Sequence, residues 1–187
     1  MYARRPLAGL RLAATVTVAS TLLVTLSGCS GEDEEREYAP PQSLCGIPVD
    51  AKALAPFLPP RRKLSVKQEV ANGNTARCVV LVDTRLPVQT SEQWLSGNHD
   101  TAYFVAGQPN SELSHQADGG RFLYSGNEAF GKTRKCVSKK LLGSELFTAF
   151  QVFTSDHRDA NAMKQLIVSY TNAVEKTDTC KAGKPLT

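Results

Sequence analysis

The distribution of cysteine constrains the fold of this chain more than any other feature. Cys29 ends an apolar N-terminal stretch, and four further cysteines are spread over the rest of the chain: Cys45, Cys78, Cys136 and Cys180. No two of these four have the close spacing typical of zinc sites or of Cys-x-x-Cys redox motifs. In an exported chain, an even number of cysteines predicts two disulfide bonds.

Residues 1–28 have the three parts of an export signal. Arg4, Arg5 and Arg11 supply positive charge, residues 12–26 form an uncharged and mostly apolar stretch, and small residues follow. The apolar stretch is shorter than the roughly 20 residues that a helix needs to span the core of a bilayer. We therefore expect an export signal rather than a permanent membrane span.

The end of this signal, Leu26-Ser27-Gly28-Cys29, resembles the bacterial lipobox. The resemblance implies that Cys29 receives a diacylglyceryl group on its sulfur, and that cleavage before Cys29 makes it the mature N-terminus. Two acyl chains, at about 0.8 kcal/mol per buried methylene, hold a protein on a membrane more firmly than one chain does. The alternative is an ordinary secretory signal with an incidental cysteine.

The segment after Cys29 is acidic and almost free of apolar side chains. Residues 29–42 carry a net charge of −4, whereas residues 43–187 carry +5. A chain of this composition cannot bury itself, so residues 29–42 are expected to be a disordered tether that begins with the lipidated cysteine. The remaining residues, 43–187, are long enough for a single domain with a core of its own.

Hydrophobic patterning predicts an α+β domain, with a mainly antiparallel sheet and helices packed on one face. Helices are expected over 49–57, with Asp50 as a possible N-cap, and after Ser155 or Asp156, where an apolar stripe suits packing on the sheet. Residues 91–95 could form a short helix that carries Trp94. Strands are expected over 64–70, 76–82, 121–124, 132–138 and 145–154.

Four cysteines can pair in three ways, and the sequence alone does not choose among them. We prefer Cys45–Cys78 with Cys136–Cys180, because each of these pairs would tie a terminal segment to a nearby strand. A metal site made of the same four residues is the weaker alternative, so no metal ligand is assigned.

The three histidines are the main candidates for chemistry. His99 and His115 lie in the polar segment 97–120, each near an aspartate, where an acid–base pair or a metal site could assemble. The competing interpretation makes both of them solvated loop residues, and gives His157 a surface position in the first turn of the last helix. No nucleophile elbow, zinc-protease motif or phosphate-binding glycine loop is present, and residues 126–131 are interpreted as a loop. We therefore assign no catalytic residue and no cofactor.

Basic residues form three clusters, which are candidates for contact with anionic partners. They are Arg61-Arg62-Lys63, Lys132 with Arg134-Lys135, and Lys139-Lys140. If they share one face, they could bind an anionic wall polymer or lipid headgroups; otherwise they form an ordinary solvated surface. Nucleic acid is not expected as a partner of an exported chain.

Residues 43–180 resemble small actinobacterial cell-surface lipoproteins of unknown function. The resemblance rests on Cys45-Gly46 followed by a short helix and a Leu-Pro stop, a central strand that carries a cysteine, and a closing helix before Cys180. It implies a lipid-anchored protein on the outer face of the cytoplasmic membrane, and it carries over no catalytic residue.

The expected function is that of a tethered, non-enzymatic binding or interaction module, whose partner is a protein or an anionic cell-wall polymer. The alternatives are a surface hydrolase with its site in residues 97–120, and a small solute-binding lipoprotein. The second alternative is less favoured because solute-binding lipoproteins usually need two lobes and a longer chain.

Overall fold

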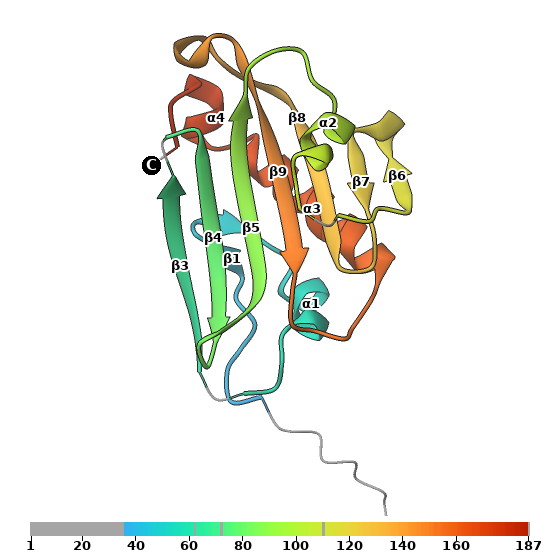
Figure 1. The fold of residues 1–187 in the computed structure, drawn as a ribbon. Coiled ribbons are helices and arrows are strands. Elements are labelled where there is room, and N and C mark those ends of the chain that lie inside the picture. The colour runs from blue at the N-terminus through green and yellow to red at the C-terminus, as the bar shows by residue number, and fades with distance from the viewer. Residues whose placement is uncertain (1–35, 62, 72, 110, 187) are drawn as a thin grey trace, which may run out of the picture. The chain divides into compact units, whose positions relative to one another are not determined.

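The computed structural model describes residues 36–61, 63–71, 73–109 and 111–186 (Figure 1). The predicted signal peptide, Cys29 and the first part of the acidic tether lie outside the described residues. No helix in the described ranges is long and apolar enough to cross a membrane.

The described residues form a seven-stranded sheet in which all neighbouring strands are antiparallel, in the order β3-β4-β5-β9-β8-β7-β6. In chain order the strands are β3 (Leu64–Ala71), β4 (Thr75–Val82), β5 (Arg85–Leu95), β6 (His115–Ala117), β7 (Phe122–Tyr124), β8 (Glu128–Ser138) and β9 (Ser144–Val152). A separate two-stranded ribbon joins β1 (Ser43–Leu44) to β2 (Ile47–Pro48).

Helices lie on both faces of the large sheet, but unequally (Figure 1). One face is covered by α1 (Ala51–Leu54), α3 (Ala160–Val174) and α4 (Asp178–Ala182), and it holds most of the core. On the other face, α2 (Thr101–Ala106) packs Phe104 against Phe130 and Phe147. The predicted α+β class with two disulfides is confirmed, and among the α-helices of the described residues α2 alone lies on the second face.

Helix α3 packs on the sheet through the stripe that its sequence predicted. Met163, Leu166, Ile167, Tyr170 and Val174 are all buried, and burial of each such side chain stabilises the fold by about 1.5–3 kcal/mol. The expected cap was wrong: Asp159, rather than Ser155 or Asp156, accepts hydrogen bonds from the first free N–H groups. Residue 157 consequently precedes the helix instead of lying in its first turn.

The two disulfides pair as preferred. Cys45, between β1 and β2, is bonded to Cys78 of β4 with 5.8 Å between their Cα atoms. Cys136 of β8 is bonded to Cys180 of α4 with 4.7 Å between their Cα atoms. Each bond therefore ties a terminal segment to a strand of the large sheet, on the face that holds the main core.

Two local expectations were wrong. Residues 91–95 continue strand β5, where Trp94 lies opposite Leu146 of β9 and is buried in the core. Residues 128–131, expected in a loop, form the first part of strand β8 and lie between β7 and β9. In both cases the segment lies between two partner strands, and ladder pairing outweighs a weak local pattern.

The described chain makes its first contacts before the expected start of the domain at Ser43. The Arg36 guanidinium donates to the carbonyl oxygens of Ala55 and Leu58, each at 2.8 Å. Tyr38 donates its hydroxyl to Pro59 O. These bonds place the N-terminal end of the described chain beside the segment that leads into β3, at the lower end of the sheet in Figure 1.

Candidate functional site

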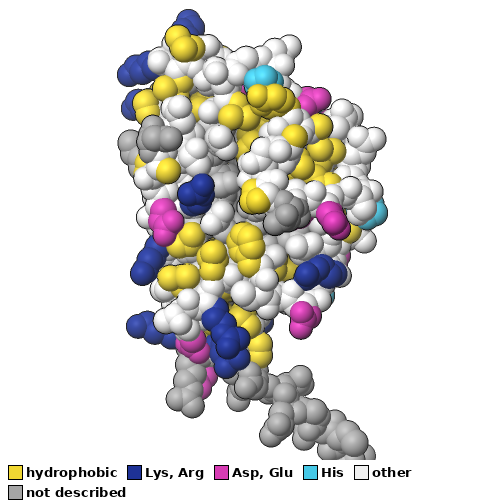
Figure 2. Space-filling model, viewed as in Figure 1, with side chains coloured by type: hydrophobic (Ala, Val, Ile, Leu, Met, Phe, Trp, Pro, Cys, Tyr) yellow, Lys and Arg dark blue, Asp and Glu magenta, His cyan; other side chains and the backbone are white. Residues whose placement is uncertain are grey.

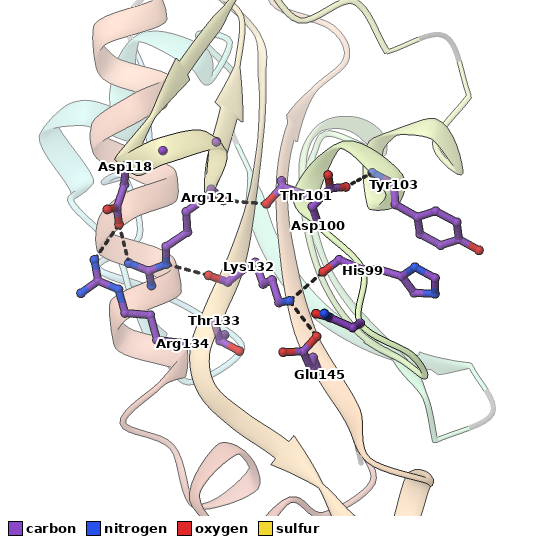
Figure 3. Close-up of a pocket in the computed structure, with 13 residues that line it drawn as sticks. His99, Asp100, Thr101, Tyr103, Asp118, Arg121, Lys132, Thr133, Arg134 and Glu145 are labelled. Carbon is purple, nitrogen blue, oxygen red and sulfur yellow. Dashed lines mark hydrogen bonds and ion pairs between the residues drawn. The ribbon is translucent and has the colours of Figure 1, made fainter.

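A polar cavity of about 690 Å³ lies beside α2, where the sequence placed the alternative hydrolase site (Figure 3). Residues 98–101 and Tyr103 form one wall, and residues 118–121 with β8 form the other. The cavity is positioned by the N-cap of α2, where Asp100 accepts a hydrogen bond from Tyr103 N, and by the Thr101 hydroxyl, which donates to Arg121 O at 2.8 Å.

The charged side chains on one side of this cavity bind one another. Lys132 Nζ lies 2.7 Å from Glu145 Oε2 and donates to His99 O at 2.6 Å. This ion pair is only partly exposed, so bulk water screens it less than it screens a surface pair. The Lys132 ammonium is therefore already occupied by a carboxylate and a carbonyl oxygen.

The charged side chains on the other side are also paired. Arg121 bridges Asp118 and Glu175, with N–O distances of 3.2 and 2.8 Å, and Arg134 lies 2.7 Å from the same Asp118 oxygen. The hydrogen bond from Arg121, with a further one from Arg134, lowers the pKa of Asp118 below its usual value. This network holds η2 (Asp118–Gly120) against β8 and α3.

Only one of the three histidines lines the cavity. The His99 ring stacks on Tyr103 with 3.6 Å between centroids, and Figure 3 shows it directed away from Lys132 and Glu145. His115 instead stacks on Tyr124, and His157 meets the edge of Phe57. The three rings thus have separate stacking partners, and neither His115 nor His157 lines the cavity beside α2. The absence of enzyme activity stays a prediction.

The basic clusters are divided between the two ends of the sheet. Arg61 and Lys63 lie where β3 begins, whereas Lys139 and Lys140 lie in the β8–β9 connection at the opposite end. Within the middle cluster, Lys132 and Arg134 are engaged in the cavity network. Arg61 and Lys63 therefore do not form one continuous basic surface with Lys139 and Lys140, and Arg62 lies outside the described residues.

A second candidate site lies on the face of β4, β5 and β9 opposite α3; we call it the open-face groove. It is a hollow of about 310 Å³, and its lining residues are Thr75, Arg77, Gln89, Ser91, Gln93, Gln108, Pro109, Gln151 and Phe153. A neighbouring hollow of about 280 Å³ shares Pro109, Gln151 and Phe153 with it and continues to Asn127 and Glu128. The groove therefore crosses the sheet from β4 to the start of β8.

Strand register brings the lining residues of the groove together. Thr75 lies opposite Gln93, Arg77 opposite Ser91, and Gln89 opposite Gln151. Alternate residues of a strand point to the same face, so these side chains line one surface while Val88 and Trp94 of the same strand enter the core. Figure 2 shows this face, where most charged side chains lie toward the margins.

The polar side chains that line the groove form no hydrogen bond or ion pair within the described part of the chain. No hydrogen bond or ion pair to another described residue engages the side chains of Thr75, Arg77, Gln89, Ser91, Gln93, Gln108 or Gln151. The cavity beside α2 differs in this respect, because its Arg and Lys groups are all paired. Of the two hollows, the groove has the larger supply of free donors and acceptors.

Sequence reasoning missed the groove. Gln89, Ser91 and Gln93 recur at a spacing of two, which is the signal of a strand with a polar face, but Thr90 and Glu92 between them are also polar. The alternation that would identify the strand is therefore absent, and the expected short helix covers residues 91–95 of it. Thr75 of β4, Gln151 of β9 and Phe153 just after β9 come from segments distant in the sequence and carry no local signal.

The comparisons with known proteins assign no function to either hollow. Among the described residues, no group of three or more His, Cys, Asp or Glu side chains is arranged to hold a metal ion. No protein-family model matches the chain, and searches among curated proteins and among solved structures found no significant match.

Proposed function

We propose that this protein is an extracytoplasmic lipoprotein, anchored in the membrane through Cys29, which acts as a non-enzymatic binding module. The observation that carries the binding role is the open-face groove, whose polar side chains make no bond within the described chain. Ligand sites are typically concave and present a few convergent polar groups to the ligand. The groove meets this description, and no His, Asp, Glu or Lys side chain lines its main hollow to act as a general base for the Ser91 hydroxyl.

The lipid anchor is supported by the fact that the four other cysteines are all paired with one another. Cys45, Cys78, Cys136 and Cys180 are consumed in two disulfides, which favour an oxidising compartment. Cys29 is thus the one cysteine left for modification, and it stands in the Leu-Ser-Gly-Cys context.

The position of Arg36 is compatible with ligand binding by an anchored domain. Residues 29–35 span at most about 25 Å when extended, and the chain joins the domain at the end of the sheet where β3 begins. The open-face groove lies on one face of the sheet, and its lining runs from Thr75 and Gln93, away from this end, to Gln151 and Phe153 at the end of β9. Part of the groove is therefore distant from the point of attachment, where a partner can reach it while the domain stays tethered.

Membrane fractionation of a Cys29→Ser variant tests the anchor, with Ser30→Ala as the matched control. We expect the wild-type protein and Ser30→Ala to be recovered in the membrane fraction, and processed Cys29→Ser to be released from it. A processed Cys29→Ser protein that still partitions with membranes would contradict the proposal.

Photo-crosslinking on intact cells tests the binding role. A photoreactive amino acid replaces Gln93, which lines the groove, or Lys164, which is exposed on α3 on the opposite face. We expect a discrete adduct from position 93 and none from position 164. An adduct that forms only from position 164 would place the binding surface elsewhere.

The competing proposal is a surface hydrolase, and it is favoured by the cavity beside α2, which His99 and Asp100 line. Catalysis by His99 would need a partner that orients its ring and perturbs its pKa. Screening the protein against ester, phosphate, peptide and glycan substrates tests this alternative. Turnover that His99→Ala abolishes would favour the hydrolase over the binding module.

A further inference from the structure

We infer that the ligand of the open-face groove is a polysaccharide strand, laid across β4, β5 and β9. This inference rests on the proposed function and names the chemical class of the ligand. It follows from the hydrogen-bonding groups of the groove, from its low charge, from one exposed aromatic ring, and from its length.

The hydrogen-bonding groups of the groove match those of a sugar. Four glutamines line it, Gln89, Gln93, Gln108 and Gln151, and each amide offers two donated protons and one acceptor oxygen. A sugar hydroxyl likewise donates and accepts, so neighbouring hydroxyls can pair with both atoms of one amide. The side chains of all four glutamines are free to do so, since none bonds to another described residue.

The charge of the groove excludes strongly anionic polymers. Arg77 is the single cation and Glu128 the single carboxylate among the lining residues of the two hollows. Proteins that bind nucleic acid or anionic lipid surfaces use several Lys or Arg side chains, because each one neutralises a negative group. A groove with one guanidinium, one carboxylate and four glutamine amides instead suits a neutral strand, or one with widely spaced negative groups.

Phe153 provides an apolar surface beside these polar groups. Its side chain lines both hollows and is 53% exposed, although it is one of the larger apolar residues of the chain. One side of a pyranose ring carries mainly C–H groups, which pack flat on an aromatic ring while the hydroxyls at the rim stay free to bond. Phe153 and Gln151 are placed for these two contacts, because both lie at the junction of the two hollows.

The length of the groove favours a polymer over a single sugar. The main hollow and its neighbour share Pro109, Gln151 and Phe153, and together they cross from β4 to β8. With neighbouring strands about 4.8 Å apart, the three intervals between four strands span about 14 Å, which exceeds one sugar unit.

An extended peptide fits this groove less well. Peptides bind to sheets chiefly by adding a strand at an edge, where unpaired backbone groups are available. The groove lies on the middle of the sheet, where β5 and β9 are already paired with each other along Val88–Leu95 and Glu145–Val152. Only side chains face the ligand there.

The experiment measures glycan binding by the full chain purified in detergent. The probes are oligosaccharides of two to six units built from hexoses, pentoses or N-acetylhexosamines, and the competitors are polyphosphate and a mixture of unstructured peptides. We expect binding to at least one oligosaccharide series, with affinity rising from two units to four. Calorimetry on the best probe then compares the variants.

In that comparison, Gln151→Ala and Phe153→Ala should each weaken binding at least about tenfold, and Phe153→Tyr should retain it. The matched control Lys164→Ala, on the opposite face, should change the affinity less than about twofold. Thermal unfolding of each variant separates lost contacts from lost folding, and the retained binding of Phe153→Tyr reports on the aromatic ring itself.

The glycan assignment fails if no oligosaccharide binds, if the groove variants bind as the wild type does, or if polyphosphate or peptide binds in place of glycan. A crosslink from position 93 to a protein or to a second copy of the chain, without glycan binding, would reject the glycan and keep the binding module. Absence of both the crosslink and glycan binding would reject both proposals.

Discussion

The Tyr170 hydroxyl of α3 donates a hydrogen bond to Glu92 of β5, with 3.3 Å between the hydroxyl and Oε1. This contact lies on the core side of the strand whose other side lines the open-face groove. It also lies next to the Cys45–Cys78 disulfide, because both cysteines and Glu92 line one small hollow. Glu92 thus introduces an ionisable group into the layer between the sheet and α3.

We expect stability to fall as the pH rises through the titration of Glu92. Burial raises the pKa of Glu92 above its usual 4.5, while the hydrogen bond from Tyr170 lowers it in part. Because the folded state holds this proton more tightly than the unfolded state does, the stabilising effect is complete below pH 4.5. It is lost as the pH rises through the folded-state pKa.

Glu92→Gln keeps an acceptor for Tyr170 and removes the titration. We therefore expect chemical denaturation to show a smaller loss of unfolding free energy for Glu92→Gln than for the wild type between pH 4 and pH 8. Glu69→Gln, at an exposed position of β3, is the control. Parallel pH profiles of wild type and Glu92→Gln would show that Glu92 does not titrate differently in the folded state.

The Cys136–Cys180 disulfide should contribute substantially to stability. It closes a segment of 44 residues, for which loop-closure entropy predicts about 4 kcal/mol. Replacing both cysteines by alanine should lower the unfolding free energy by roughly 3–4 kcal/mol, measured by urea denaturation without reductant. A loss below about 1 kcal/mol would mean that the unfolded chain gains little freedom when this bond is removed.

Gly131 of β8 should not tolerate a larger residue. A Cβ at this position would lie 2.8 Å from Thr171 Oγ1 and 2.9 Å from the Phe122 ring, and the buried Thr171 hydroxyl is held 2.7 Å from that of Thr148. We expect Gly131→Ala to lower the unfolding free energy by about 1–3 kcal/mol.

Gly107 provides the control for that substitution, because a Cβ there would be 3.5 Å from Phe104 O, an ordinary contact. Gly107→Ala should therefore change the melting temperature far less than Gly131→Ala does. Equal shifts for the two variants would contradict close packing between α3 and β8.

Leu142 at the tip of the β8–β9 connection should be a site where substitution stabilises the protein. Its backbone is left-handed, with φ 53° and ψ 37°, and its side chain is 90% exposed. A left-handed conformation costs a residue such as leucine about 1–2 kcal/mol, and asparagine adopts it more readily. Leu142→Asn should raise the unfolding free energy by roughly 0.5–1 kcal/mol.

The adjacent Gly143, with φ of +75°, provides the opposite test of the same turn. Gly143→Ala should destabilise, because alanine is strained at that angle. The melting temperatures of the two variants should shift in opposite directions. If Leu142→Asn lowered the melting temperature, the leucine side chain would make stabilising contacts despite its exposure.

The elements with strong periodicity could be predicted from the sequence. The alternation of residues 64–70 and the apolar stretch 76–82 recur as β3 and β4, and the turn between them contains Gly73 with a positive φ. The stripe from Met163 to Val174 recurs as the buried face of α3. Each of these signals lies within one segment, where side-chain spacing alone determines which residues share a face.

The sequence by itself predicted the α+β class, and it supplied the prediction of an export signal that ends in Leu-Ser-Gly-Cys and leaves an even number of further cysteines. Only the tertiary structure decided that 91–95 is a strand, because that segment is stabilised by pairing with β4 and β9 on its two sides. The tertiary structure also created the open-face groove, because it brings together Arg77, Gln93 and Gln151 from three strands. Their proximity depends on register between distant segments, which no local pattern encodes.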